Sequence, residues 1–386
     1  MKAIVAIGSI FCGFLVASNF VGAQTWTPLT NTPVEDWRFI GMSANGNTIV
    51  AGTHGENFIL TSTNAGATWI TNKNPIEFGQ AACSADGTKW ICTDADQATY
   101  RSTNSGISWF LATETANGWV ACSADGNILG GFDALSTNGG TTWRSYTGFP
   151  GIPAFPANGS KWLGIATQEP NMGFFISTNM GMTWISNSIP TNIYYEAVGI
   201  SADGNTIVGG VQNGTQAGVL YFTTNSAASW STANVPTNLW TGAACSADGS
   251  KLVAVAYSVF TYPYYGSIYT STNHGVSWVS NNAPLLSWDA VACSADGSKM
   301  VAAPENGQIY VSNSKPSPQL NIASPSNGNF NFSWLMPSTN LALQESSDLM
   351  SWATVTNAPS LNYTNLQEQL TLSPTNSDGF FRLVSQ

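Results

Sequence analysis

Short apolar segments separated by polar turns fill most of this chain. In the first unit, residues 37–43, 48–52 and 58–62 are rich in aromatic and β-branched side chains, and Trp69 opens a fourth segment. The turns between these segments contain Asn-Gly or a glycine, which tolerate the positive φ angles of tight hairpins. The pattern predicts four short antiparallel strands, which we name A to D.

This unit recurs along the chain. Its A–B turn reads Ser-Ala-Asp-Gly or Ser-Ala-Asn-Gly and begins at Ser43, Ser84, Ser123, Ser201, Ser246 and Ser294, with a variant at residues 156–159. Its C–D turn ends in a tryptophan, at Trp69, Trp109, Trp143, Trp184, Trp230 and Trp278. A period of roughly 33 to 48 residues that carries two turn signals predicts an all-β fold, the β-propeller.

The seventh A–B turn, at Ser294, has no tryptophan after its strand C at residues 308–312. The missing tryptophan lies near the N-terminus, because Thr25-Trp26 aligns with Thr68-Trp69. We therefore expect a seven-bladed β-propeller over residues 24–314, in which the N-terminal strand closes the last blade and covers its open edge.

The C–D turn resembles the Asp-box of BNR repeats, Ser-x-Asp-x-Gly-x-Thr-Trp. Asparagine stands in the Asp position at Asn64, Asn104, Asn138, Asn179 and Asn273, while Ala227 replaces the glycine in the copy that ends at Trp230. The resemblance implies that these asparagines accept backbone N–H groups within the turn. It also implies that the box tryptophans, Trp26 included, pack between sheets as structural residues.

The sialidases share this repeat, but sialidase activity is not expected here. That family clamps its substrate carboxylate with three arginines, and the predicted propeller contains only Arg38, Arg101 and Arg144. Arg101 and Arg144 adjoin C–D turns, on the face opposite the expected site, and no Phe-Arg-Ile-Pro motif surrounds Arg38.

The repeat ends at a Pro/Ser-rich stretch that begins with Lys315, which is typical of a linker. Alternating segments at residues 330–334, 341–344, 351–355 and 380–384 then predict a small β-sandwich, so residues 315–386 form a linker and a C-terminal module. This module resembles fibronectin-like modules of exported bacterial proteins, which implies a role in spacing, attachment or export.

The N-terminus predicts export. Lys2 precedes an apolar stretch at residues 3–17, and small residues lead to a cleavage site after Ala23. We expect residues 1–23 to be a signal peptide, the mature chain to start at Gln24, and the protein to be secreted or held in the cell envelope. The apolar stretch is short for a membrane-spanning helix, so no integral membrane segment is expected in the mature chain.

Composition removes one class of partner. The chain carries a net charge of -10, and its 11 basic residues are scattered. Nucleic acid binding requires clustered Lys and Arg, so no nucleic acid partner is expected. No cofactor is predicted, and we expect a monomer.

Cysteine usage predicts buried thiols. Cys83, Cys122, Cys245 and Cys293 directly precede an A–B turn, at a position where other copies have methionine, phenylalanine or isoleucine, so this is an apolar core position. Cys83 and Cys92 form the only pair that we consider for a disulfide, and the sequence leaves this open. With only His54 and His274 as histidines, no Cys/His metal site is predicted.

Aromatic residues mark the candidate ligand site on the face of the D–A and B–C loops. One set opens strand A in five repeats: Trp37, Phe78, Tyr195, Trp240 and Trp288. A second set lies in the long B–C loop at residues 257–265: Tyr257, Tyr262 and Tyr264. Such rings can stack on sugars or contact a protein, and the alternative that they pack within the fold stays open.

These patterns predict an exported, non-catalytic binding or scaffold protein whose ligand is an extracellular glycan or protein. The alternative is a secreted glycoside hydrolase that uses a pair of loop carboxylates. Its candidates are Glu35, Asp36, Glu77, Asp94, Asp96, Glu169, Glu196, Asp289 and Glu305. A purely structural role in the envelope, without a ligand, is a third possibility.

Overall fold

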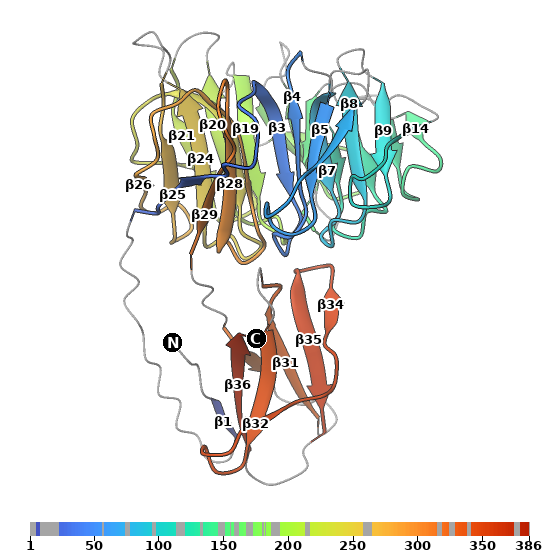
Figure 1. The fold of residues 1–386 in the computed structure, drawn as a ribbon, viewed down its shortest axis with the longest axis vertical. Coiled ribbons are helices and arrows are strands. Elements are labelled where there is room, and N and C mark those ends of the chain that lie inside the picture. The colour runs from blue at the N-terminus through green and yellow to red at the C-terminus, as the bar shows by residue number, and fades with distance from the viewer. Residues whose placement is uncertain are drawn as a thin grey trace.

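The computed structural model consists of antiparallel four-stranded sheets, as Figure 1 shows. It describes residues 5–7, 23–55, 58–73, 78–94, 98–112, 120–131, 134–145, 151–154, 156–157, 162–166, 173–179, 181, 183–186, 194–212, 217–257, 265–314, 319–323, 329–337, 341–373 and 379–385. Within these residues, no helix is long and apolar enough to cross a membrane.

Each repeat predicted from the sequence forms one sheet, with its strands in the order A, B, C, D. The sheets are β3(Trp37–Met42)-β4(Ile49–Thr53)-β5(Phe58–Ser62)-β6(Ile70–Lys73), β7(Phe78–Cys83)-β8(Trp90–Asp94)-β9(Thr99–Ser102)-β10(Phe110–Leu111), β11(Ala121–Cys122)-β12(Leu129–Gly130)-β13(Ala134–Ser136)-β14(Arg144–Ser145), β15(Gly151–Ala154)-β16(Trp162–Ala166)-β17(Gly173–Ser177)-β18(Ile185–Ser186), β19(Tyr194–Ile200)-β20(Ile207–Gln212)-β21(Leu220–Thr223)-β22(Ser231–Thr232) and β23(Leu239–Cys245)-β24(Leu252–Tyr257)-β25(Ile268–Ser271)-β26(Val279–Ser280).

The last repeat takes its outer strand from the N-terminus. Its sheet is β27(Trp288–Cys293)-β28(Lys299–Pro304)-β29(Tyr310–Asn313)-β2(Thr27–Pro28), in which Thr27 pairs with Val311. Trp26 is 4% exposed and packs in the core of this region. The N-terminal strand therefore closes the last sheet, as predicted.

The hydrophobic core lies between neighbouring sheets, because a strand inside such a stack is covered on both faces. All five residues of β4 are buried. Ile49 and Leu60 of the first sheet share a cluster with Val301 and Ile309 of the last repeat, so the first and last sheets pack together.

A ring of backbone hydrogen bonds links the A–B turns. In each turn the alanine at the second position donates its N–H to the carbonyl oxygen of the corresponding alanine in the next turn. The donor–acceptor pairs are Ala44–Ala85, Ala85–Ala124, Ala124–Ala157, Ala157–Ala202, Ala202–Ala247, Ala247–Ala295 and Ala295–Ala44, at distances between 2.7 and 3.3 Å. The ring closes on itself.

The C–D turns share one network of hydrogen bonds. In the first, Asn64 Oδ1 accepts from the backbone N–H of Thr68 at 2.8 Å, and Ser62 Oγ accepts from the N–H of Gly66 at 2.8 Å. In the copy with an alanine in place of the glycine, Asn225 Oδ1 still accepts from the N–H of Ser229 at 3.0 Å, while Ala227 takes a φ of 62°. The asparagine network therefore persists in this copy, although alanine is strained in the left-handed region.

The C-terminal residues form two further sheets that enclose one core. The first is β30(Asn321–Ala323)-β31(Phe330–Leu335)-β35(Gln367–Leu372)-β34(Ser360–Asn362), and the second joins β36(Gly379–Ser385), β32(Leu341–Ser346) and β33(Ala353–Thr354) to β1(Val5–Ile7). Phe332 and Trp334 of the first sheet pack against Phe381 of the second. The strand β1 lies within the predicted signal peptide and pairs with β36.

Candidate functional site

The repeat domain has two faces with different contents. The turn face carries the A–B and C–D turns, and the loop face carries the B–C and D–A connections. The C-terminal module lies against the turn face (Figure 1), where Leu335, Met336 and Leu366 pack on the alanines of the A–B turns. The backbone N–H of Met336 donates to the carbonyl oxygen of Leu366 at 2.8 Å, which ties the two contacting loops together.

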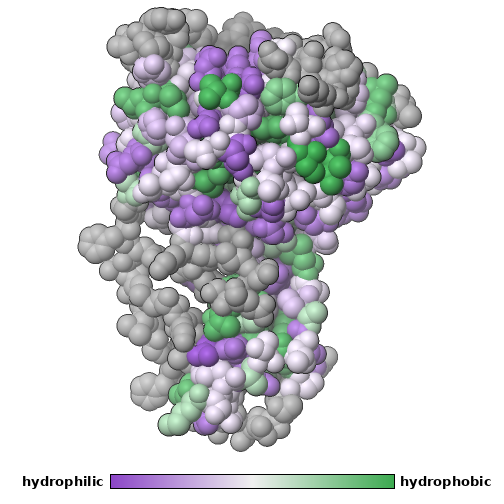
Figure 2. Space-filling view, viewed as in Figure 1, coloured by the Kyte–Doolittle hydropathy of each residue, from purple (hydrophilic) through white to green (hydrophobic). Residues whose placement is uncertain are grey.

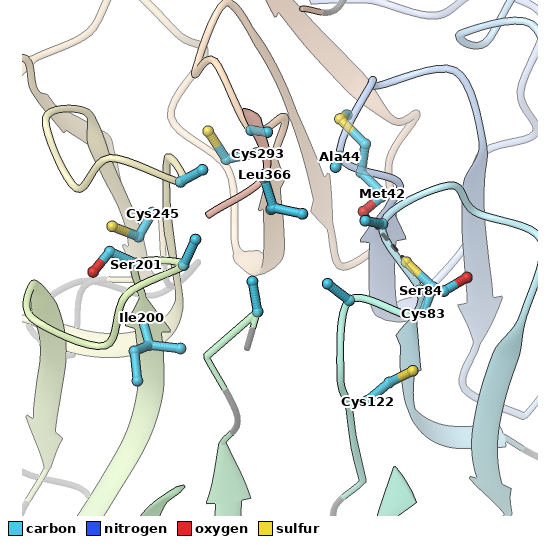
Figure 3. Close-up of a pocket in the computed structure, with 16 residues that line it drawn as sticks. Met42, Ala44, Cys83, Ser84, Cys122, Ile200, Ser201, Cys245, Cys293 and Leu366 are labelled. Carbon is cyan, nitrogen blue, oxygen red and sulfur yellow. Dashed lines mark hydrogen bonds between the residues drawn. The ribbon is translucent and has the colours of Figure 1, made fainter. Parts of the chain in front are cut away.

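A cavity of about 180 Å³ lies on the turn face, inside the ring of alanines. Its wall includes four thiols, from Cys83, Cys122, Cys245 and Cys293, and Leu366 of the C-terminal module contributes to its lining (Figure 3). The chain itself thus covers this end of the central channel.

Burial favours the protonated form of the thiols in this cavity. Burial raises the pKa of Cys83 and of Cys293 to about 12, and it raises the pKa values of Cys122 and Cys245 as well. A thiol with a raised pKa stays protonated at neutral pH and is a poor nucleophile and metal ligand.

Cys83, Cys92, Cys122, Cys245 and Cys293 are free thiols, so Cys83 and Cys92 do not form a disulfide in this structure. In the described part of the chain, no three His, Cys, Asp or Glu residues are arranged to hold a metal ion.

The tryptophans that open strand A are packing residues. Trp37, Trp240 and Trp288 have no exposed surface, and each meets an aromatic ring of strand C in its own sheet edge-on, such as Tyr310 at 5.2 Å from Trp288. A ring without accessible surface cannot stack on a sugar. The predicted ligand-binding role is therefore wrong for these three residues, and the alternative of packing within the fold holds.

The loop face also has hydrogen bonds between neighbouring repeats, and two of these tryptophans make them. Trp37 Nε1 donates to the carbonyl oxygen of Gly307 at 2.7 Å, and Trp240 Nε1 donates to that of Gly218 at 3.0 Å. Each glycine lies in the B–C connection of the preceding repeat around the ring. Trp37 and Trp240 thus each join one sheet to the next, whereas Trp288 Nε1 is buried without a hydrogen-bond partner among the described residues.

Of the remaining aromatic candidates, the structure describes the side chain of Tyr257 alone. Tyr257 is half-buried at the end of β24, where the long B–C loop begins. Tyr262 and Tyr264 lie outside the described residues, as do the side chains of Phe78 and Tyr195. Tyr265, in the same loop as Tyr262, is 47% exposed.

Tyr265 is held in place by the residue that follows it. Gly266 donates its backbone N–H to the carbonyl oxygen of Leu286 in the next repeat at 2.8 Å. A Cβ atom on Gly266 would meet the carbonyl oxygen of Ala256 at 1.8 Å, so only glycine fits there. In the sequence, the feature that could have pointed to Tyr265 as an ordered residue of this loop is the glycine that follows it, Gly266.

Two acidic groups, Asp36 and Glu305, influence each other electrostatically at the junction of the first and last repeats on the loop face. Burial and the nearby Glu305 raise the pKa of Asp36, while His54 and Arg38 oppose this shift. His54 Nδ1 lies 4.0 Å from Asp36 Oδ2, and Glu305 Oε2 accepts from Ser287 Oγ at 2.8 Å.

Among the other carboxylate candidates, Glu35 lies at the same junction, where its backbone pairs with that of Gly307. Asp94 is buried and accepts from the backbone N–H of Ala98 at 2.6 Å, within its own loop. Glu35 and Asp289 are half-buried. Glu77, Asp96 and Glu169, and the side chain of Glu196, lie outside the described residues.

The visible surface of the repeat domain mixes hydrophilic residues with residues of intermediate hydropathy (Figure 2). In Figure 2 the apolar residues are scattered over the repeat domain among polar ones. The most exposed large apolar side chains there include Val276, at 72%, and Leu111, at 63%.

Comparison with known proteins identifies the fold. No protein-family model and no curated protein matches this chain. Among solved structures, YCF48 from Cyanidioschyzon merolae is 14% identical, with a TM-score of 0.57, over 76% of this chain and 99% of that one. A GH74 xyloglucanase from Xanthomonas campestris is 14% identical, with a TM-score of 0.60, over 81% of this chain and 59% of that one. The fold is that of a β-propeller.

A third similar structure belongs to another kind of protein. Hydrazine synthase from Kuenenia stuttgartiensis is 11% identical, with a TM-score of 0.58, over 74% of this chain and 98% of that one. The xyloglucanase and the hydrazine synthase are named for different activities, so the likeness shows the architecture alone.

Proposed function

We propose that this chain is an exported, non-catalytic binding protein that holds an extracellular glycan or polypeptide on the loop face of a seven-bladed β-propeller. The propeller comprises residues 24–314 and is followed by a linker and a small C-terminal β-sandwich. The repeat belongs to the Asp-box type, and residues 1–23 are a signal peptide.

The ring of alanines supports seven blades. Each A–B turn contributes one alanine, and the bond from Ala295 to Ala44 returns to the first turn. The shared core of the two C-terminal sheets, around Phe332 and Phe381, supports the β-sandwich.

The contact between the C-terminal module and the turn face carries the proposal. Leu366 lines the thiol cavity, and Leu335 and Met336 pack beside it, so this end of the propeller is occupied within the chain. The loop face is left for a ligand, and connecting loops on a rigid scaffold are the usual place for binding.

The chemistry of the loop face suits a neutral or weakly charged polymer. Only 8% of the residues are charged, so recognition would rest on hydrogen bonds and aromatic contact rather than ion pairs. Tyr257 and Tyr265 bracket the long B–C loop, and tyrosine combines a flat apolar ring with a hydroxyl at a low cost in conformational entropy.

A binding array tests this proposal. Wild type and Tyr265→Ala are applied to arrays of extracellular polysaccharides and of immobilised peptides, beside Tyr363→Ala as a control. Tyr363 is 40% exposed on the C-terminal module, away from the loop face. We expect binding to one of the two polymer classes, weakened by Tyr265→Ala and kept by Tyr363→Ala. Equal binding by all three proteins would contradict the site.

The second candidate function is hydrolysis of a glycoside, and the pair Asp36 and Glu305 favours it. A carboxyl with a raised pKa beside a second carboxylate is the pattern of a general acid and its partner. Release of reducing sugar from a bound polysaccharide, abolished by Asp36→Asn and by Glu305→Gln but not by Glu345→Gln on the C-terminal module, would establish the hydrolase and overturn the non-catalytic proposal.

A further inference from the structure

The first residue after the predicted cleavage site is bound by a buried side chain. The backbone nitrogen of Gln24 donates to Asn281 Oδ1 at 2.7 Å. Asn281 is 7% exposed, and its Nδ2 donates to the carbonyl oxygen of Ile268 at 3.1 Å. This second bond fixes the orientation of the amide, because it uses the nitrogen and turns the oxygen toward Gln24.

Asn281 has an equivalent in Asn72 of the first repeat, whose Nδ2 also donates to a threonine of strand C, but it differs from the residue in two other repeats. Its backbone N–H donates to the carbonyl oxygen of Ile268 in strand C, just as Ala112 donates to Thr99 and Ala233 donates to Leu220 in other repeats. Those repeats place a buried alanine where this one places an amide. A buried amide costs free energy unless it is hydrogen-bonded. Asn281 Oδ1 accepts from Thr270 Oγ1 at 3.2 Å within its own sheet, and Gln24 supplies a second, shorter hydrogen bond from outside that sheet.

We propose that Gln24 is a modification site, which cyclises to pyroglutamate after signal-peptide cleavage. Asn281 Oδ1 then accepts a hydrogen bond from the N–H of the lactam. The inference rests on the proposed export of the chain, which makes Gln24 the terminal residue. It adds a covalent step that the binding function does not require.

The reaction needs no co-substrate. The α-amine of Gln24 attacks the carbonyl carbon of its own side-chain amide, so an N–Cδ bond forms. The Cδ–Nε2 bond breaks, a proton passes from the attacking to the leaving nitrogen, and ammonia departs. No atom is oxidised or reduced.

The binding site fits the lactam better than a free terminus. A terminal ammonium carries a charge and three protons, whereas the described residues give this nitrogen one acceptor, the neutral oxygen of Asn281. Holding a charge in a half-buried position against a neutral amide is unfavourable. A lactam nitrogen is a neutral amide with one proton, like the backbone nitrogen that makes this bond here.

The neighbouring residues keep the terminus in place. Thr25 forms a parallel bridge with Asn282, and Trp26 is buried in the core. The side-chain oxygen of Gln24 accepts from Ser312 Oγ at 3.1 Å. The backbone nitrogen of Gln24 is thus bound to the sixth repeat, through Asn281, and its side chain is bound to the last repeat.

Mass spectrometry of the exported protein tests the inference. The full chain is expressed in an exporting bacterial host, and the intact protein and its N-terminal peptide are measured after labelling of free amines. The variant Gln24→Ser, which cannot cyclise, serves as the control for labelling.

The expected wild-type peptide begins at residue 24, is lighter than the glutamine peptide by one ammonia, and carries no label. A peptide that begins with a labelled glutamine at position 24 would overturn the modification while leaving export intact. A chain that keeps residues 1–23 would contradict the proposed export and the modification together.

Discussion

Ala295 donates its backbone N–H to the carbonyl oxygen of Ala44 at 2.7 Å, and this bond joins the last A–B turn to the first. Both residues belong to the repeated Ser-Ala-Asp-Gly or Ser-Ala-Asn-Gly turn. Alanine suits the position because its small side chain lets the turns approach closely around the channel. The most repeated short sequence of the chain thus forms the bonds that hold the repeats to one another.

Hydrogen exchange should reveal this ring. The amide protons of Ala44 and Ala295 are expected to exchange only through global unfolding, since both are bonded between repeats. The amide of Ala67 bonds to Asn64 within an exposed turn and is the control, which we expect to exchange quickly. Exchange of Ala295 as fast as that of Ala67 would show that the ring does not hold in solution.

Closure by the N-terminal strand predicts a large effect at Trp26. Trp26→Ala removes a buried ring from the core between the last two repeats, and we expect it to lower the free energy of unfolding by about 3–5 kcal/mol. Urea denaturation of Trp26→Ala and of the exposed Thr25→Ala measures this. The closure would be refuted by equal stability of the two variants.

The C-terminal module should protect the channel thiols. Leu366→Ala opens the cavity, so we expect faster labelling of Cys83, Cys122, Cys245 and Cys293 by a thiol reagent. Leu349→Ala is the matched control, because Leu349 is also a leucine with positive φ in this module but is 45% exposed.

The labelling rate of Cys83 and Cys293 should keep rising with pH beyond the ordinary thiol value of 9.0, since their pKa is about 12. Labelling of Leu366→Ala at the wild-type rate would mean that the module does not cover the cavity.

Glu368 gives the C-terminal module a defined response to pH. Trp334 Nε1 donates to Glu368 Oε2 at 2.6 Å, and burial raises the pKa of this carboxyl. A raised pKa means that folding favours the protonated form, so this contribution to stability is present at low pH and is lost as the pH rises through the folded-state pKa.

Glu368→Gln keeps an acceptor for Trp334 and removes the buried charge. We expect it to stabilise the protein at pH 7 by less than about 1 kcal/mol, and to have no such effect at a pH where the carboxyl is already protonated. Thermal unfolding at both pH values checks this, with the exposed Glu345→Gln as control. A loss of stability at pH 7 would contradict the assigned direction.

The repeats were readable from the sequence because each turn depends on side-chain chemistry. Asn64 and Gly66 are residues that the C–D turn requires, and Trp26 matched the missing box tryptophan. The alanine ring was not foreseen, since a backbone hydrogen bond between repeats requires only that the side chain be small.

The candidate site was less predictable. A tryptophan at the start of strand A gives the same pattern whether it stacks on a ligand or bonds to a glycine of the neighbouring repeat, as Trp37 does with Gly307. The position of the C-terminal module was equally hidden, because Leu366 is an isolated apolar residue within a turn, and Leu335 and Met336 only continue the apolar pattern of a strand.

Site-specific photo-cross-linking tests the central claim most directly. A photoreactive amino acid replaces Tyr265 on the loop face in one protein and Tyr363 on the C-terminal module in another, and each is irradiated in the exporting cells. The account predicts one discrete adduct, a glycan or a polypeptide, at position 265 and none at position 363. An adduct at position 363 alone, or none at position 265, would contradict the assignment of the loop face as the ligand-binding surface.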